Sequence, residues 1–326
     1  MCVKIEISDK DIKYAERILL NENQHFNNER IAFIKNLETI DLQAIPGSGK
    51  TTVLLAKLLI LEEYLPLVNN SGVLVISHTN AAVDEIKNKI SQYCPKLFGY
   101  PNFVGTIQSF VNTFLAIPFY INHFKTKPYR IDSEIYDEKI KNVLSNIWSY
   151  KFDFSKDVLK KIFYIKNANP SIFYSYRFEI DNYKIILTKS LNSEKLKINK
   201  PRGRTRNYKD YIEQEKKVLY HWFFRLKKEM LFKHQILHFD DAYFLANYYL
   251  IKYPDIKNIL QKRFKYVFVD EMQDMEIHQY KLLESIFYDE GNCTSVFQRI
   301  GDKNQAIFDG SAQLMIYGNI VIKSFI

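Results

Sequence analysis

The fold of this chain is decided by one stretch, Ile40-Asp41-Leu42-Gln43-Ala44-Ile45-Pro46-Gly47-Ser48-Gly49-Lys50-Thr51-Thr52. Its first residues have strand character, and an apolar pattern typical of a helix follows over Thr51 to Tyr64. Glycines between a strand and a helix let backbone N–H groups turn inward around an anion, to which the helix N-terminus adds partial positive charge. Lys50 can then reach the β- and γ-phosphates, and Thr51 offers a hydroxyl to Mg²⁺. We therefore expect residues 44–52 to bind the phosphates of a nucleotide.

Further strands follow along the chain, separated by helical patterns such as Ala81 to Tyr93. The five segments with strand character are Ile40 to Ala44, Val73 to Ser77, Phe103 to Thr106, Tyr266 to Val269 and Ser295 to Ile300. Strands that alternate with helices are typical of a parallel sheet. The sequence therefore predicts an α/β fold built on a parallel P-loop sheet.

An acidic motif ends the fourth of these strands and reads Val269-Asp270-Glu271-Met272-Gln273-Asp274. Ligands of open α/β sheets bind at the carboxyl ends of the strands, so these carboxylates should face the phosphate loop. We expect Asp270 to hold Mg²⁺, usually through water, and Glu271 to orient or deprotonate the water that attacks the γ-phosphate. The alternative is a solvated acidic turn, but an apolar, buried strand makes its acidic end costly without a cation.

The fifth strand runs into Gly301-Asp302-Lys303-Asn304-Gln305. A glutamine just past a strand end can donate a hydrogen bond to the γ-phosphate, and we expect Gln305 to take part in catalysis in this way. An ordinary turn is the alternative for this motif.

Residues 118–235 interrupt the α/β rhythm. They hold 26 Lys and Arg against 13 Asp and Glu, whereas the whole chain has a net charge of +9, so all of the positive excess lies here. Helical patterns over Ser133 to Ser149 and Asp210 to Leu231 flank a basic loop from Lys195 to Lys209. We expect an ATP-binding domain formed by residues 1–117 and 236–326, with residues 118–235 inserted as a mainly helical basic subdomain.

The basic loop is a candidate contact for a nucleic-acid backbone, because clustered cations attract phosphates. The arginines expected to make this contact are Arg202, Arg204 and Arg206. A solvated excursion of the chain is the alternative, since runs of charge often have no partner.

Composition argues against several classes of protein. The longest strongly apolar stretch, Val53 to Leu65, is interrupted by charges and falls short of the roughly 20 residues of a membrane span. The three cysteines form no C-x-x-C pair, which argues against a disulfide framework and against a zinc site. We expect a cytoplasmic protein without a membrane partner.

The order of the motifs resembles that of superfamily 1A helicases of the UvrD/Rep type. The pieces that match are AxxGSGKT at 44–51, Thr79-Asn80-Ala81-Ala82, Gly105-Thr106-Ile107-Gln108-Ser109-Phe110, DEMQD at 270–274 and GDKNQAIF at 301–308. The resemblance implies a RecA-like domain that uses ATP and Mg²⁺. It also implies that Gln305 couples nucleotide state to the grip on DNA. The residues it assigns to single-stranded DNA are Thr79, Asn80, Thr106, Gln108 and Phe308.

The sequence departs from the family pattern in several places. Gln24 fits the spelling of the family's adenine-reading motif but lies 26 residues before Lys50. Gln108 stands where the family often has His, and Ala81 where it often has Lys. No Trp or Arg typical of the third motif follows Phe308.

Two functional hypotheses use these same sites. The first is the motor domain of an ATP-driven DNA helicase or translocase that acts on single-stranded or tailed duplex DNA. The second is a nucleotide-gated DNA-sensing subunit that regulates a partner nuclease, for example in anti-phage defence, without translocating. A small-molecule kinase would need the phosphate loop but neither DEMQD nor GDxxQ. Only eighteen residues follow Phe308, so we expect the second RecA-like domain to be absent and to be required in trans for unwinding.

Overall fold

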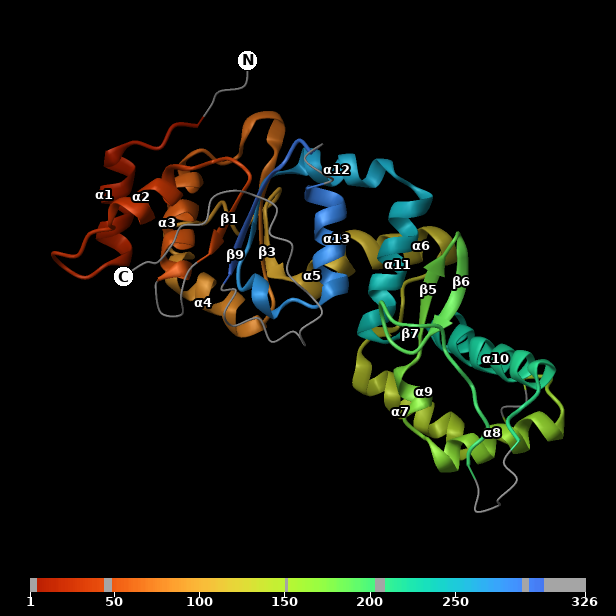
Figure 1. The fold of residues 1–326 in the computed structure, drawn as a ribbon. Helices are drawn as coiled ribbons and strands as arrows, with labels where there is room; N and C mark the ends of the chain where they lie inside the picture. Colours follow the sequence, from red (N-terminus) through yellow and green to blue (C-terminus); the bar gives the residue numbers. More distant parts are fainter. Residues whose placement is uncertain (1–4, 44–48, 150–151, 203–208, 289–292, 302–326) are drawn as a thin grey trace. The chain divides into compact units, whose positions relative to one another are not determined.

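The five strands that the sequence predicts form one parallel sheet. Its order is β1 (Ile40–Gln43), β9 (Val296–Gly301), β8 (Phe264–Val269), β2 (Gly72–Ser77) and β3 (Phe103–Thr106). Figure 1 labels β1, β9 and β3 of this sheet. Each neighbouring pair is parallel, with registers such as Ile40↔Gln298 and Val267↔Phe297. The α/β fold class is therefore confirmed. Strand β9 lies between β1 and β8, so it separates the strand before the phosphate loop from the strand before the acidic motif.

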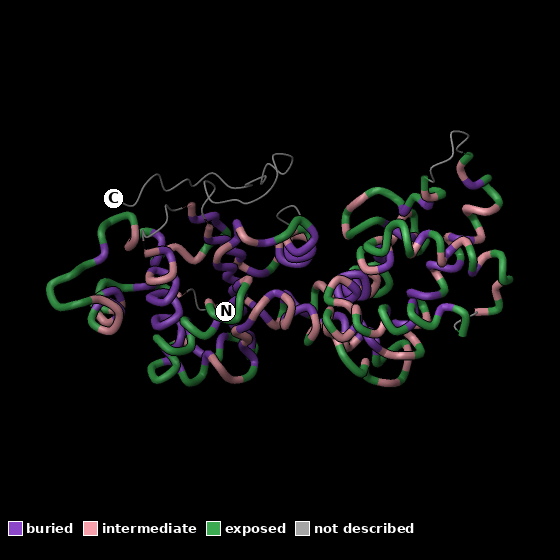
Figure 2. Tube along the Cα trace, turned by 90° about the horizontal axis from the view of Figure 1, so that it is seen from below, coloured by how far each residue is buried: buried purple, intermediate pink, exposed green. Residues whose placement is uncertain are grey.

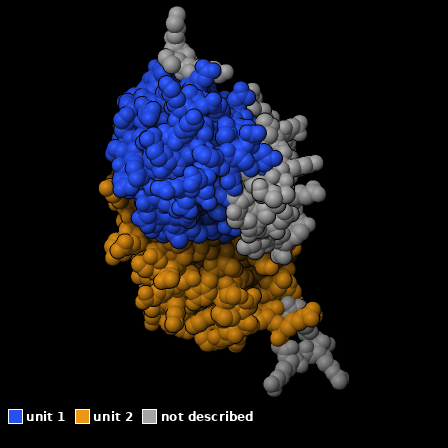
Figure 3. Space-filling model, turned by 90° about the vertical axis from the view of Figure 1, so that its left-hand side faces the viewer, with its two compact units in different colours: residues 1–110, 253–326 blue, residues 111–252 orange. Residues whose placement is uncertain are grey.

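The structure is a computed structural model that describes residues 5–43, 49–149, 152–202, 209–288 and 293–301. The chain divides into two compact units, which Figure 3 colours separately. The first unit is residues 1–110 with 253–326, and the second is residues 111–252. The second unit includes α11 (Phe239–Lys252), which lies beyond the end of the expected insertion. Helix α11 belongs to this unit because its Tyr248 packs against Phe119 of α6 (Ile117–Phe124). Within the described ranges, no helix is both long and apolar enough to cross a bilayer.

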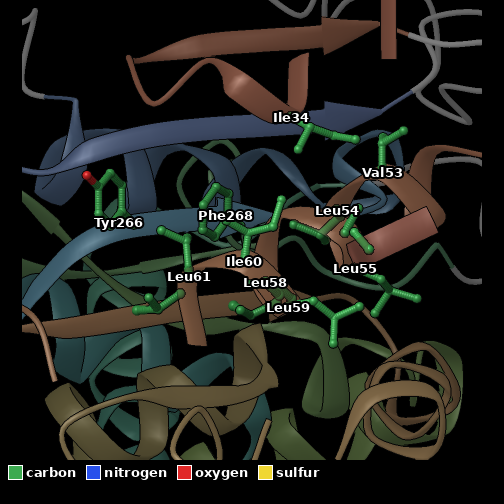
Figure 4. Packing of buried hydrophobic residues seen from close by; sticks show 14 of the residues in the cluster. Ile34, Val53, Leu54, Leu55, Leu58, Leu59, Ile60, Leu61, Tyr266 and Phe268 are labelled. Atoms are coloured by element: carbon green, nitrogen blue, oxygen red, sulfur yellow. The ribbon is translucent and has the colours of Figure 1, made fainter. Parts of the chain in front are cut away.

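Helices of the first unit cover the two faces of the sheet. They are α1 (Asp9–Leu19), α2 (Asn28–Lys35), α3 (Lys50–Glu63), η1 (Val68–Asn70), α4 (Asn80–Ile90), α5 (Ile107–Val111), α12 (Asp255–Arg263), η4 (Met272–Asp274) and α13 (Ile277–Phe287). Helix α3 is buried on all sides from Val53 to Glu62, as a helix at the centre of a core must be. Figure 4 shows Leu58, Ile60 and Leu61 of this helix beside Tyr266 and Phe268 of β8.

The opposite face of the sheet carries an aromatic cluster. Phe110 and Phe287 have ring centroids 5.9 Å apart, and Phe287 lies 6.2 Å from Phe297 of β9. Side chains of a strand alternate between faces, which is why Phe297 meets α13 while its neighbour Gln298 faces α3. Helices on both faces keep the strands buried. Figure 2 colours the buried residues of the chain purple.

The second unit is mainly helical. Its helices are η2 (Asn112–Ala116), α6 (Ile117–Phe124), α7 (Ser133–Ser145), α8 (Lys156–Ala168), α9 (Ile172–Ser175), α10 (Glu213–Lys228), η3 (Glu229–Lys233) and α11. It also has an antiparallel hairpin of β5 (Arg177–Asp181) and β6 (Lys184–Thr188), and a short pair of β4 (Arg130–Ile131) and β7 (Ile236–Leu237). Trp222 and Phe223 of α10 are fully buried, so this helix supplies much of the core.

Candidate active site

The phosphate-loop helix begins at the carboxyl end of β1. Gly49 is the cap of α3 and has a φ of 83°, a left-handed conformation that favours glycine. Lys50, the first residue of the helix, is only 7% exposed. The 14-residue helix directs its free N–H groups and its partial positive charge to this point. The predicted site residues Ala44, Ile45, Pro46, Gly47 and Ser48 lie outside the described residues.

The structure brings Thr51 and Asp270 together, although 219 residues separate them in the sequence. The Thr51 hydroxyl lies 3.4 Å from Asp270 Oδ2 and donates toward it. Asp270 is 1% exposed at the end of β8, where its backbone N–H donates to the Ile76 carbonyl at 2.8 Å. Burial, and next the charge of Glu271, raise the pKa of Asp270 to about 6. An ionised carboxylate is therefore costly here unless a cation accompanies it.

A hydroxyl and a carboxylate side by side fit a hard cation. Magnesium takes oxygen ligands and usually keeps one or two carboxylates together with waters and phosphate oxygens. In the described part of the chain, no group of three or more His, Cys, Asp or Glu side chains converges to bind a metal by itself. Thr51 and Asp270 would therefore hold the ion together with a bound phosphate rather than form a closed protein cage.

Glu271 adopts a left-handed backbone conformation, with φ at 51° and ψ at 46°. Such a conformation is strained for a residue with a Cβ, and strain of this kind concentrates at functional sites. The side-chain amide of Gln273 donates a hydrogen bond to the Glu271 carboxylate. Burial and the charge of Glu271 also raise the pKa of Asp274. The acidic motif is thus a constrained cluster of carboxylates at the edge that Lys50 and Thr51 also reach.

Gly301 ends β9 beside this acidic motif. A Cβ at Gly301 would lie 2.8 Å from Gln273 Oε1 and 3.2 Å from Met272 Cβ, so a larger residue would require these neighbours to shift. Two predicted site residues, Gln305 and Phe308, lie outside the described residues.

Thr79 follows β2 and Thr106 ends the neighbouring strand β3, and both cap helices. Thr79 Oγ1 accepts a hydrogen bond from the backbone of Ala82 at 3.2 Å at the start of α4. Thr106 Oγ1 accepts from the backbone of Ser109 at 3.1 Å at the start of α5. Asn80 is exposed and Gln108 is half-buried. Because β2 and β3 are parallel partners with Ser77 opposite Thr106, these residues lie at the same edge of the sheet as Thr51 and Asp270.

Sequence reasoning missed Arg30. Its guanidinium, carried by α2, would lie 3.7 Å from a Cβ placed on Gly49, so it reaches the first turn of the phosphate-loop helix. A cation at this point is suited to phosphate or to the base and sugar of a nucleotide. No sequence signal marks Arg30, because the contact arises from packing of α2 and not from a fixed spacing to the loop.

In the second unit, a groove of about 440 Å³ lies between residues 196–199 and α10. Its lining includes Lys197, Lys216, Lys217 and Tyr220. The Tyr220 hydroxyl accepts a hydrogen bond from the backbone of Leu187 at 2.6 Å, which fixes the ring against the hairpin. Arg202, just beyond the groove's first segment, is exposed, while Arg204 and Arg206 lie outside the described residues.

Comparison with known families agrees with this geometry. The family description "UvrD/REP helicase N-terminal domain" matches residues 25–312. The chain belongs to this family. The match includes all five strands of the sheet together with Lys50, Asp270 and Gln305.

The chain is also similar to individual proteins, at 25 to 34% identity. The chain is 27% identical over 286 residues to a probable DNA helicase II homolog of Mycoplasma capricolum, covering 86% of this chain and 34% of the relative. It is 25% identical over 268 residues to the ATP-dependent DNA helicase Rep of Buchnera aphidicola (subsp. Schizaphis graminum), covering 80% and 34%. A stretch of 100 residues is 34% identical to the putative ATP-dependent DNA helicase YjcD of Bacillus subtilis, covering 31% and 12%. The chain spans about a third of the length of the first two relatives.

Proposed function

We propose that this chain is the ATP-binding motor domain of a UvrD-type DNA helicase or translocase. The observation that carries the proposal is the meeting of Thr51, at the N-terminus of α3, with the buried carboxylate of Asp270. A free helix N-terminus attracts phosphate, and a buried carboxylate beside a hydroxyl calls for a cation. One ligand, Mg²⁺ with a nucleoside triphosphate, satisfies both needs.

Each residue of the site has a distinct role in this proposal. Lys50 and the backbone N–H groups of residues 44–52 bind the phosphates, and Thr51 and Asp270 hold the metal, whose charge neutralises the developing charge on the phosphoryl oxygens. Glu271 orients the attacking water and accepts its proton. Gln305 contacts the γ-phosphate. Arg30 adds a cation beside the first turn of α3.

We assign single-stranded DNA to the same sheet edge and to the second unit. At the edge, the DNA-contacting residues are Thr79, Asn80, Thr106, Gln108 and Phe308. Because the side-chain oxygens of Thr79 and Thr106 cap helices, we assign the contact at these positions to exposed helix-start backbone as well as to side chains. In the second unit, the groove of Lys197, Lys216 and Lys217 binds the phosphate backbone, with Arg202, Arg204 and Arg206 beside it.

Strand separation requires a second surface that closes over bound ATP. In superfamily 1 motors a second RecA-like domain supplies arginines to the transferring phosphoryl group, which are worth about 10³ to 10⁵ in rate in related NTPases. We place that surface in the two thirds of the relatives' length that this chain does not span, or in a partner polypeptide.

The direct test is the ATP hydrolysis rate of the purified chain with and without single-stranded DNA, measured over many turnovers. A motor domain gives Mg²⁺-dependent hydrolysis that rises with DNA and falls to background in Glu271→Gln. A single turnover per molecule that DNA does not accelerate would instead support a nucleotide-gated sensor. Failure to bind ATP would overturn both.

A further inference from the structure

Strand β9 is unusual for a central strand, because two consecutive polar side chains in it are buried. Gln298 is 0% exposed and Arg299 is 5% exposed, whereas β2 beyond β8 reads Gly-Val-Leu-Val-Ile-Ser. Consecutive strand residues point to opposite faces, so each face of the sheet receives one of them. Burying such groups is costly unless every polar atom has a partner. The hydrogen-bond and ion-pair partners of Gln298 and Arg299 therefore indicate what these buried side chains do.

On the first face, Gln298 meets Lys57 of the phosphate-loop helix. Lys57 lies seven residues after Lys50 and is 0% exposed. Its amine donates to Gln298 Oε1 at 2.6 Å and to the Asn36 carbonyl at 2.8 Å, and lies 3.8 Å above the Phe33 ring. The Gln298 amide in turn donates to the Asn36 and Glu38 carbonyls at 3.0 and 2.7 Å. This face of β9 is thus tied both to α3 and to the chain just before β1.

On the second face, Arg299 joins β9 to β1 and α13. Its guanidinium forms a two-pronged ion pair with Asp41 of β1, with Nη2 2.8 Å from Oδ2. It also pairs with Glu284 and donates to the Tyr280 hydroxyl at 3.2 Å, both on α13. Two parallel N–H···O bonds fix direction as well as distance.

We infer that Lys57 and Arg299 clamp β9 from its two faces and thereby position Glu271 for hydrolysis. The path is short and lies within the described residues. Gly301, two residues beyond Arg299, lies so close to Gln273 that an added Cβ would be 2.8 Å from Gln273 Oε1, and Gln273 donates its side-chain amide to the Glu271 carboxylate. The inference rests on the proposed function, which gives Glu271 its role. Lys57 and Arg299 are positioning residues, because neither contacts the acidic motif itself.

The clamp explains why β9 has buried polar side chains at positions where apolar side chains ordinarily pack. Buried ion pairs contribute little net stability compared with apolar residues of similar size, but they penalise wrong pairings. A slip of β9 by one residue would move Arg299 to the face of Lys57 and would move its end by about 3.3 Å. Arg299 would then meet the amine of Lys57, while Asp41 and Glu284 would lose their partner. The register of β9 that places Gly301 beside Gln273 is therefore strongly favoured over a slipped one.

Two variants test the clamp from its two faces. Lys57→Met keeps the length and apolar contacts of the side chain and removes the donors, while Asn36 still receives the Gln298 amide. Arg299→Lys keeps a charge beside Asp41 but loses the fork. The matched control is Lys87→Met, an exposed lysine of α4.

Two readouts are measured on each variant. Hydrogen exchange of the β9 amides should accelerate about tenfold in both clamp variants, with β2 and β3 unchanged. The kcat for ATP should fall about tenfold or more while ATP affinity stays within about twofold, because a small misplacement near reacting groups is enough to slow chemistry. Lys87→Met should match wild type in both readouts.

The clamp would be overturned if the β9 amides of both clamp variants exchanged at the wild-type rate. It would also be overturned if kcat fell only in variants that had lost ATP binding. If Lys57→Met does not fold, Arg299→Lys decides. If wild type does not bind ATP, the proposed function fails, and exchange in β9 still tests whether the clamp holds the strand.

Discussion

Replacing Asp270 by Asn should stabilise the fold while it destroys the metal site. The pKa of Asp270 is raised from 3.8 to about 6, chiefly by burial and then by Glu271. About two pKa units at about 1.4 kcal/mol each correspond to roughly 3 kcal/mol of unfavourable free energy at pH 7, when Asp270 is ionised in the folded protein. Asn has the same shape and can still accept from the Glu271 N–H, which lies 3.0 Å from Oδ1.

The sign of the pH dependence follows from the direction of the shift. Between pH 4 and pH 6 the folded protein keeps a proton on Asp270 that the unfolded chain loses, so the penalty grows as the pH rises. The advantage of Asp270→Asn should therefore be full above about pH 6 and vanish below about pH 4. Removing a charge from a ligand site often stabilises a protein in this way at the expense of function.

Urea denaturation in EDTA, without nucleotide, measures this advantage. Circular dichroism follows both units, whereas Trp148 and Trp222, the chain's two tryptophans, both lie in the second unit and serve as an internal control. Mg²⁺ with ATP at about 100 times its Kd should stabilise wild type by about 2.7 kcal/mol and the variant by much less. A variant that is less stable than wild type at pH 7 without ligand, or that gains as much stability from Mg²⁺ and ATP, would show that Asp270 is neither destabilising nor a metal ligand.

Further predictions concern catalysis and DNA binding. Glu271→Gln keeps the shape of the side chain and removes its charge, so ATP and Mg²⁺ should bind normally while hydrolysis in rapid-quench assays falls at least about 100-fold; loss of ATP binding would contradict the role of Glu271. Gly301→Ala should lower kcat with little change in ATP affinity, because its Cβ would lie 2.8 Å from Gln273 Oε1, and an unchanged kcat would remove Gln273 from the path. Changing Lys197, Lys216 and Lys217 to Ala should flatten the log–log salt dependence of single-strand affinity by about 2, as expected for three phosphate contacts. The exposed pair Lys141 and Lys160 serves as the control, and a slope equal to wild type in the triple variant would exclude the groove.

The sheet could be predicted from the sequence because its strands are short apolar runs between helical patterns. All five lie within about a residue or two of the expected bounds, and the Asp270 carboxylate lies beside Thr51 as the parallel arrangement requires. The order β1-β9-β8 was not predicted, since strand order depends on which helix covers which face. The β5–β6 hairpin was also missed. Its turn residues, Asn182 and Tyr183, both have positive φ but offer no glycine as a signal.

The clamp on β9 could not be found in the sequence for a related reason. Phe297-Gln298-Arg299-Ile300 gives no sign that Gln298 and Arg299 are buried, because polar side chains are mostly exposed. Their partners lie far away in the chain, with Lys57 241 residues from Gln298 and Asp41 258 residues from Arg299. Arg30 escaped notice in the same way. Periodicity identifies elements, whereas contacts of this kind depend on tertiary packing.

The central claim is that the N-terminus of α3 and Asp270 together bind Mg²⁺ and ATP. It is tested by equilibrium titration of a fluorescent ATP analogue into wild type and Lys50→Ala, with Mg²⁺ and with EDTA. Equal melting temperatures of the two proteins show that the substitution leaves the fold intact. We expect saturable binding to wild type that weakens without Mg²⁺ and is lost in Lys50→Ala, because that change removes a charge-assisted phosphate contact. Equal affinity of the two proteins for the nucleotide would contradict it.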